Sequence, residues 1–157
     1  MIQYKIATFD DAETLANARI SLLDEDSGLS GEARDALHAK TLTYMRDATR
    51  AGTWLAFLAF EDGELVGTAG ATLYETLPGI KLPNGKNAYI QNVYVAPQHR
   101  RGGVGRELIR CTVAESQARG FTRITLSATE KGAALFRTCG FEFAPHVGLL
   151  EMEYKAN

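Results

Sequence analysis

The sequence predicts a mixed α/β (α+β) fold in which helices flank one sheet. Two long stretches near the N-terminus place apolar residues at helical spacing, and shorter runs around them alternate like strands. Glycine and proline signals separate these segments. Together the patterns give the order β-α-α-β-β-β-α-β-α-β-β, with about seven strands and about four helices.

The N-terminal part is predicted as a strand followed by two helices. Residues 2–6 alternate as a strand, and Thr8 can cap the helix in which apolar residues recur over 12–23. The polar run at residues 24–28 is expected to break this helix. Its acidic side chains are either solvated loop charges or a rim that attracts an amine. Ser30 can cap the second helix.

Turn signals set the connections between the later segments. Asp62-Gly63 is a typical hairpin pair. Residues 76–87 form a loop with three glycine or proline signals, which is either functional or a simple hairpin extension. The remaining predicted segments are helices at residues 30–52, 104–119 and 129–136 and strands at residues 53–60, 65–74, 88–95, 121–127, 141–143 and 149–154.

The most informative stretch, residues 92–109, is predicted to form a strand, a tight turn and a helix. Pro97 ends the strand because it has no N–H group to give to a sheet. The next helix begins at Val104, where apolar residues start to recur at helical spacing. We call residues 100–106, which contain three glycines and three arginines, the glycine turn.

The glycine turn has the chemistry of a pyrophosphate-binding site. A helix N-terminus presents unpaired backbone N–H groups and the positive end of the helix dipole to one point. Glycine lets a bulky anion approach the backbone, and arginine adds positive charge. The alternative is a glycine-rich helix start with solvated arginines. The predicted contacts are Arg100, Arg101, Gly102, Gly103, Val104, Gly105 and Arg106.

Two familiar phosphate loops do not fit this stretch. A Walker A loop needs Lys-Ser/Thr after its glycines, and a dinucleotide fingerprint needs a third glycine where Leu108 stands. The pattern that fits is Arg-x-x-Gly-x-Gly at Arg100, Gly103 and Gly105, preceded by Val-Tyr-Val-x-Pro. On these residues the chain resembles the GCN5-related N-acetyltransferase (GNAT) superfamily, whose acetyl-CoA site is this loop. Residues 135–141 resemble the family's Leu-Tyr-x-x-x-Gly-Phe segment and extend the resemblance to essentially the whole chain.

The resemblance implies a single GNAT acetyltransferase domain over residues 1–157, with a central, mostly antiparallel mixed sheet splayed at a β-bulge. It also implies transfer of acetyl from acetyl-CoA to a primary amine by direct attack in a ternary complex, with no metal. The strand segment Val93-Tyr94-Val95 is implied to bind the pantetheine arm through its backbone, and the Val93 N–H to be the oxyanion donor. Thr129 is a further pantetheine candidate.

The resemblance does not identify the general acid or the general base of the reaction. The family's glutamate position holds Tyr89, and a tyrosine is not a base at neutral pH. The family's tyrosine acid position holds Phe136, which has no proton to give but can pack against the thioester. A catalytically weak acyl-CoA sensor of the same fold is therefore the alternative function. Candidate replacements for the acid are Ser127, Thr129, Cys139 and Tyr94.

Composition and charge limit the classes of binding partner and the compartment that we expect. A net charge of −2 argues against a broad nucleic-acid-binding surface and favours a cationic or neutral small acceptor over a protein. The two cysteines form no Cys-x-x-Cys pair, which indicates a reducing cytoplasm. No apolar run reaches the roughly 18 residues of a membrane span. The acceptor, the acyl-donor preference and the oligomeric state are left open, although homodimers are common in the resembled family.

Overall fold

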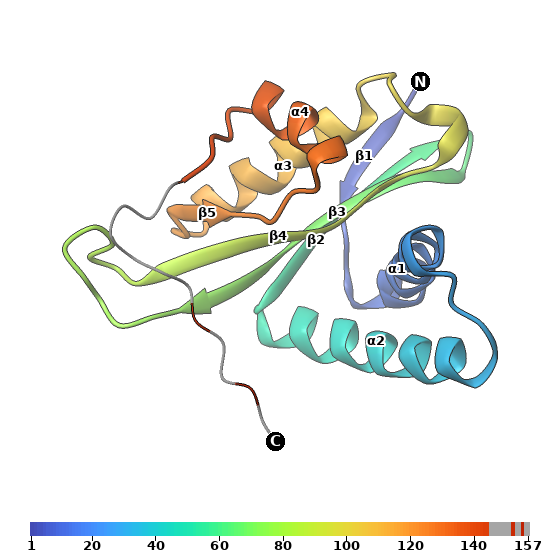
Figure 1. Cartoon of the computed structure of the whole chain (residues 1–157), viewed down its shortest axis with the longest axis horizontal. Helices are drawn as coiled ribbons and strands as arrows, with labels where there is room; N and C mark the ends of the chain where they lie inside the picture. The colour runs from blue at the N-terminus through green and yellow to red at the C-terminus, as the bar shows by residue number, and fades with distance from the viewer. Residues whose placement is uncertain (145–151, 153–154, 156–157) are drawn as a thin grey trace.

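Five strands form one sheet in the described part of the computed structural model, which covers residues 1–144, 152 and 155. The spatial order is β1-β2-β3-β4-β5, and only the β4–β5 pair is parallel (Figure 1). This mixed, mostly antiparallel sheet confirms the predicted fold class. The strands are β1 (Gln3–Ile6), β2 (Trp54–Glu61), β3 (Glu64–Glu75), β4 (Lys86–Val95) and β5 (Arg123–Thr125).

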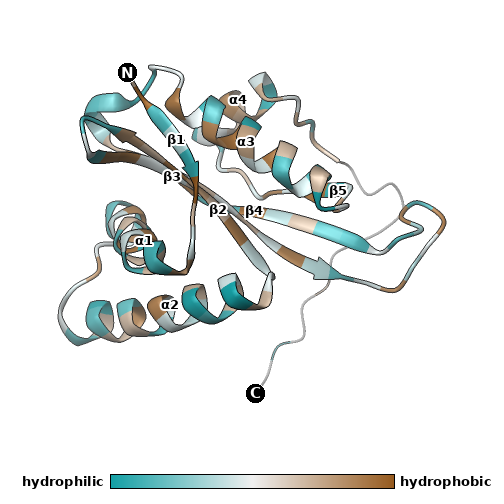
Figure 2. Cartoon of the chain, turned by 180° about the vertical axis from the view of Figure 1, so that it is seen from behind, coloured by the Kyte–Doolittle hydropathy of each residue, from teal (hydrophilic) through white to brown (hydrophobic). Residues whose placement is uncertain are grey.

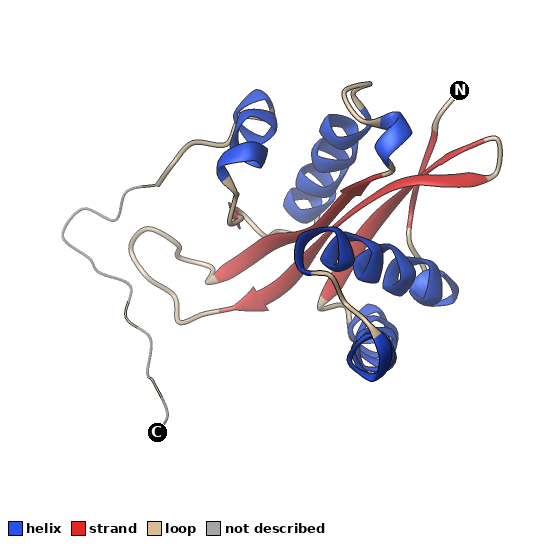
Figure 3. Cartoon of the chain, turned by 45° about the vertical axis from the view of Figure 1, so that its right-hand side comes forward, coloured by secondary structure: helices blue, strands red, loops and turns tan. Residues whose placement is uncertain are grey.

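Helices cover both faces of the sheet. Two of them, α1 and α2, pack on one face, whereas α3 and α4 lie on the other (Figure 3). Apolar residues concentrate in the central strands between these two layers (Figure 2). Short 3-10 turns at Phe9–Asp11 and Pro97–His99 precede α1 and α3. The helices are α1 (Ala12–Ser27), α2 (Gly31–Ala51), α3 (Val104–Ala118) and α4 (Glu130–Thr138).

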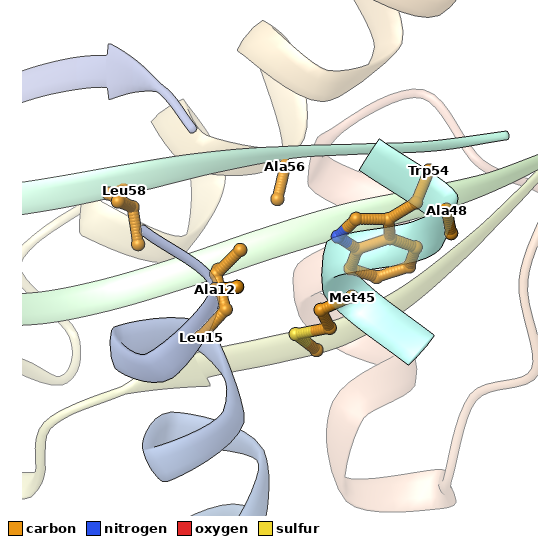
Figure 4. Packing of buried hydrophobic residues seen from close by; sticks show 7 residues of the cluster. All are labelled: Ala12, Leu15, Met45, Ala48, Trp54, Ala56 and Leu58. Carbon is orange, nitrogen blue, oxygen red and sulfur yellow. The ribbon is translucent and has the colours of Figure 1, made fainter. Parts of the chain in front are cut away.

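Successive side chains of strand β2 point to opposite sides of the sheet, and both sets are buried, so β2 contributes to the core on each face. Leu55 packs with the core under α3. Trp54 belongs to the cluster under α1 and α2, beside Met45 and Ala48 of α2 (Figure 4). Gly70 on the neighbouring strand makes room for the indole, because a Cβ there would collide with the ring. The sheet therefore separates two distinct cores.

α1 does end within the predicted run at residues 24–28, but only at its last residue: the helix continues through the acidic residues to Ser27 and stops at Gly28, which has a φ of 63°. The acidic side chains of this last turn are paired instead of repelling one another. Asp24 accepts from Arg34 at 3.0 Å, and Glu25 accepts from Arg100 at 2.7 Å. These partners come from α2 and from the glycine turn, so local sequence could not reveal them.

The C-terminal strands differ from the prediction. β5 is shorter than residues 121–127 because it pairs with β4 only opposite residues 87–89. Residues 141–143 were expected to begin a strand, yet they form none. Phe141 instead packs edge-on against Phe136, with the ring centroids 6.2 Å apart. A strand needs a pairing partner, and the predicted last strand at 149–154 lies outside the described residues, apart from Met152.

An ion pair holds the start of α1. Lys5 donates to one carboxylate oxygen of Asp11 at 2.8 Å, and the Thr8 N–H donates to the other at 2.8 Å. Burial alone would raise the pKa of Asp11, but these hydrogen bonds and the Lys5 charge together lower it below its usual value. Such a carboxylate stabilises the fold above its unfolded-state pKa, and the effect is lost as pH falls through the folded-state pKa.

We therefore predict that Asp11→Asn lowers the free energy of unfolding by about 1 kcal/mol at pH 7. The loss should shrink at about pH 3, below the unfolded-state pKa of about 3.9, because the unfolded wild-type carboxyl then takes up protons more readily than the folded one. Urea unfolding at both pH values measures this difference. The neighbouring Asp10→Asn is the control, because Asp10 is exposed and makes no ion pair within residues 1–144. An equal loss at both pH values would contradict the assignment.

Candidate active site

A β-bulge interrupts β4 at residues 92–93. The register with β3 shifts between Thr68 and Gly70, so two residues of β4 oppose one residue of β3. Asn92 has a φ of 58°, a left-handed conformation that asparagine tolerates better than most residues. The Thr68 hydroxyl donates to the Asn92 carbonyl at 3.0 Å and fixes the bulge from inside the sheet.

β4 and β5 diverge beside this bulge. They pair over residues 87–89, and within the described chain residues 90–95 have no partner on the β5 side. Unpaired backbone groups at such an edge can bond an extended ligand. One expected pantetheine contact is occupied, since the Arg100 Nε donates to the Val95 carbonyl at 2.8 Å. The splayed edge next to Val93 matches the sheet that the family resemblance implies.

The glycine turn joins this edge to α3. Gly103 precedes the first residue of α3 with a φ of 88°, and Arg101 also has a positive φ, of 65°. The first hydrogen bond from a helix N–H runs from Glu107 to the Gly103 carbonyl at 3.1 Å. The earlier N–H groups of α3 are therefore the free donors of a helix N-terminus. A Cβ at Gly103 would meet nothing within 4 Å, so the space beside the turn is open.

The cationic groups of the turn divide into two kinds. Arg100 is engaged by Val95 and by Glu25. Arg101 and Arg106 are exposed and form no ion pair with the described residues. Gly105 has a packing role, because a Cβ there would lie 3.3 Å from the Leu135 side chain of α4. Two arginines and the helix N-terminus thus remain available to an anion.

Three of the residues assigned to catalysis come together at one cavity, which we call the Tyr89 cavity. Its volume is about 410 Å³. The Tyr89 hydroxyl donates to the Ser127 Oγ at 2.8 Å and links β4 to the residue stretch after β5. Phe136 closes one wall from α4. The other described lining residues are Arg123, Ile124, Thr125, Leu126, Ala128, Ala133, Arg137, Phe141, Glu142, Phe143 and Ala144.

Thr129 has a local role. It is the N-cap residue of α4, and its Oγ1 accepts from the Gly132 N–H at 3.1 Å. A threonine side chain at this position satisfies one of the unpaired donors of the helix start. The capping explains why a helix begins here, and the pantetheine contact of Thr129 stays a prediction.

A second cavity lies on the other face of the sheet, and we call it the Trp54 pocket. Its volume is about 330 Å³. It was missed from the sequence, although Gln91 and Asn92 stand out as two polar neighbours in an apolar strand. The lining comes from α1, α2, β2 and β4 and consists of Arg19, Leu37, Lys40, Thr41, Tyr44, Met45, Trp54, Gln91 and Asn92.

Cys111 and His99 line neither of these cavities. Burial, and then the charge of Glu107, raise the pKa of the Cys111 thiol, as befits a packed core residue rather than a nucleophile. The His99 Nδ1 lies 3.4 Å from a carboxylate oxygen of Glu61. His146 lies outside the described residues. Residues 1–144 contain no cluster of three potential metal ligands and no helix with the length and apolarity of a membrane span.

Comparison with known proteins assigns the family. The model of the acetyltransferase (GNAT) family matches residues 20–141. The chain belongs to the GNAT acetyltransferase family. This confirms the resemblance seen in the Arg-x-x-Gly-x-Gly motif. A search of curated proteins found no significant match.

Solved structures share the GNAT fold over the full length of the chain. A predicted acetyltransferase from Clostridium acetobutylicum, solved with acetyl-CoA, is 22% identical, with a TM-score of 0.84 over 98% of this chain and 96% of that one. A GCN5-related N-acetyltransferase from Ralstonia eutropha JMP134 is 24% identical, with a TM-score of 0.82 over 99% of both chains. Glucosamine-6-phosphate N-acetyltransferase from Arabidopsis thaliana is 12% identical, with a TM-score of 0.71 over 100% and 99%.

The positive φ at Asn92 gives a test of the bulge. We predict that Asn92→Ala destabilises the protein by about 1 kcal/mol relative to Asn92→Gly. The Cβ of alanine comes too close to the following carbonyl oxygen in a left-handed conformation, whereas glycine has no Cβ. Both variants remove the same polar group, so their difference isolates the backbone. Chemical denaturation measures it. Equal stability of the two variants would show that the bulge does not hold Asn92 in this conformation.

Proposed function

We propose that this GNAT protein transfers the acetyl group of acetyl-CoA to a primary amine by direct attack in a ternary complex. The observation that carries the proposal is the open edge of β4, which runs from the bulge into the glycine turn. An extended pantetheine can pair with such an edge, and a pyrophosphate suits the helix N-terminus beside Arg101 and Arg106. Acetyl-CoA in the Clostridium acetobutylicum neighbour supports the same choice of donor.

In this reaction the amine lone pair attacks the thioester carbonyl carbon, and the C–S bond breaks as the C–N bond forms. The Val93 N–H is the proposed donor to the carbonyl oxygen, on which negative charge develops. A backbone donor at a bulge is fixed in place by the sheet, so it needs no reorganisation during the step. The attacking nitrogen loses a proton to water, and the CoA sulfur gains one.

Ser127 is the proposed source of the proton for the sulfur. Its Oγ accepts from the Tyr89 hydroxyl at 2.8 Å, which leaves its own hydrogen free to be donated. As Ser127 gives up that hydrogen, Tyr89 replaces it through the existing hydrogen bond, and water, which took up the amine proton, returns one to the Tyr89 oxygen. This pair takes the place of the family's tyrosine, since Phe136 contributes only an apolar wall to the same cavity.

A small-molecule acceptor is favoured over a protein. The neighbours include glucosamine-6-phosphate N-acetyltransferase and an aminoglycoside acetyltransferase solved with sisomicin, and both are named for small-molecule acceptors. The Trp54 pocket, at about 330 Å³, has the size of a small-ligand site. We further propose that residues 1–157 act as one domain in the cytoplasm, and the homodimer stays a prediction.

Thiol release from acetyl-CoA across a panel of amines tests the activity, with amine-free and enzyme-free controls. We expect release that depends on a class of amine, and acetylated product by mass. Tyr89→Phe and Ser127→Ala should each lower kcat by about 100-fold, the low end for a positioned proton donor, with little change in the KM for acetyl-CoA. Binding of acetyl-CoA without release for any amine would instead favour a sensor, and unchanged kcat in both variants would remove the proposed donor.

The glycine turn is tested best at Gly102. Its φ is not in the left-handed range and an added Cβ would lie 3.5 Å from the His99 carbonyl, so a side chain fits there without backbone strain. We predict that Gly102→Glu weakens acetyl-CoA binding at least about 10-fold relative to Gly102→Gln, because only the charge differs and it repels the pyrophosphate. Calorimetric titration compares the two. Equal affinities would place the pyrophosphate elsewhere.

A further inference from the structure

The bulge brings two consecutive side chains into the Trp54 pocket. Gln91 and Asn92 both line it, although neighbours in a regular strand point to opposite faces. The next residue, Val93, packs into the core on the other face. The backbone proposed to hold the acetyl group therefore forms the boundary between the open β4 edge and this pocket. An amine in the pocket approaches that backbone from the side opposite to α3.

The pocket wall contains buried polar groups without partners. The side-chain amide of Asn92 and the indole N–H of Trp54 make no hydrogen bond in the described structure, although each residue is only 4% exposed. Buried polar groups are nearly always hydrogen-bonded, because an unpaired one costs about 1–3 kcal/mol. The neighbouring Gln91 is oriented by the Thr72 hydroxyl, which donates to its Oε1 at 2.7 Å. The unpaired atoms are themselves fully buried, so a ligand reaches them only if the Asn92 or Trp54 side chain shifts toward the pocket.

The charged residues of the pocket are both cations. Arg19 comes from α1 and Lys40 from α2, and no carboxylate is among the described residues that line it. Arg19 is half-buried, and neither cation forms a salt bridge with residues 1–144. A partly desolvated guanidinium without a counter-ion favours an anionic ligand. The same wall disfavours a polycationic amine, which would find repulsion and no carboxylate.

We propose that the Trp54 pocket binds the acceptor, and that the acceptor is a small amine that also carries an anionic group, either a carboxylate or a phosphate. This inference rests on the proposed acetyl transfer and names its substrate class. Arg19 and Lys40 bind the anionic group, and the Gln91 side chain lines the pocket beside the bulge. Such a ligand is zwitterionic or anionic, so the local charge of the pocket is the better guide than the net charge of −2.

Matched pairs of amines test the class. One pair is 4-aminobutyrate and its amide, and the other is glucosamine 6-phosphate and glucosamine, so the pairs separate a carboxylate from a phosphate. We expect the anionic member of at least one pair to have a kcat/KM about 10- to 100-fold higher, the range of a charge-assisted hydrogen bond. Arg19→Gln should abolish this preference by lowering the kcat/KM of the anionic member to about that of its neutral partner.

Arg46→Gln is the control, because Arg46 is an exposed cation of α2 that does not line the pocket. It should keep the preference of the wild-type protein. Equal rates for both members of both pairs, or a preference for a polycationic aminoglycoside, would overturn the proposed class while leaving acetyl transfer intact. An Arg19→Gln variant that keeps the preference would also overturn it.

Tryptophan fluorescence provides a measurement that does not depend on turnover. Trp54 is the single tryptophan of the chain and lines the pocket, so its emission reports occupancy directly. Titration with the anionic amine should give a saturable change in wild type and Arg46→Gln, and Arg19→Gln should shift the midpoint by at least about 10-fold. Binding without acetylation of any amine would support the anion-binding pocket and overturn the acetyl transfer. No saturable change with either anionic amine would overturn the pocket.

Discussion

One extra residue in β4 sets the geometry on which the rest of the site depends. The bulge at residues 92–93 bends the strand, and beyond residues 87–89 the pairing with β5 ends. The pairing with β5 ends at residue 89, shortly before the bulge, so the open edge on one side of β4 lies beside the register shift on the other. The Thr68 hydroxyl secures the bulge by its hydrogen bond to the Asn92 carbonyl. The same distortion turns Asn92 toward α2 and Val93 toward α3, so both faces of the sheet adjoin one short length of backbone.

A second constraint connects the glycine turn to α1. Arg100 bonds the last carbonyl of β4 through its Nε and the Glu25 carboxylate through a terminal nitrogen. The pair with Glu25 is partly exposed, and such pairs contribute at most about 1 kcal/mol to stability. Its main effect is positional, because it holds the end of the helix that carries Arg19 against the turn that precedes α3. The two sides of the site are thereby fixed relative to each other.

Local signals predicted most of the fold. The Asp62-Gly63 hairpin, the helix start after Thr129 and the strand–turn–helix at residues 92–109 all follow from neighbouring residues, and the structure contains each of them. The prediction was less accurate where contacts between residues far apart in the sequence determine the local structure. The acidic end of α1 stays helical as far as Gly28, and Arg34 and Arg100 pair with two of its carboxylates. The bulge was expected only from family resemblance, since no local pattern encodes a register shift.

The Trp54 pocket could not be read from the sequence for the same reason. Its walls come from α1, α2, β2 and β4, which are far apart along the chain and meet only after the helices pack on the sheet. The polar pair Gln91-Asn92 was the available signal. It is ambiguous in sequence, because a polar residue in a strand is usually at the surface. Only the structure shows that the Asn92 side chain is buried without hydrogen-bond partners, which marks this pair as part of a pocket.

The conformation of Asn92 also limits how this protein can change. A residue with a φ of 58° is readily replaced only by glycine or aspartate. Few substitutions are therefore tolerated on that wall of the pocket. The helical wall is different. Lys40 and Tyr44 are exposed on α2, in a backbone conformation that accepts nearly any side chain. A lineage could therefore acquire a new ligand preference by substitutions on α2, while the strand stays invariant.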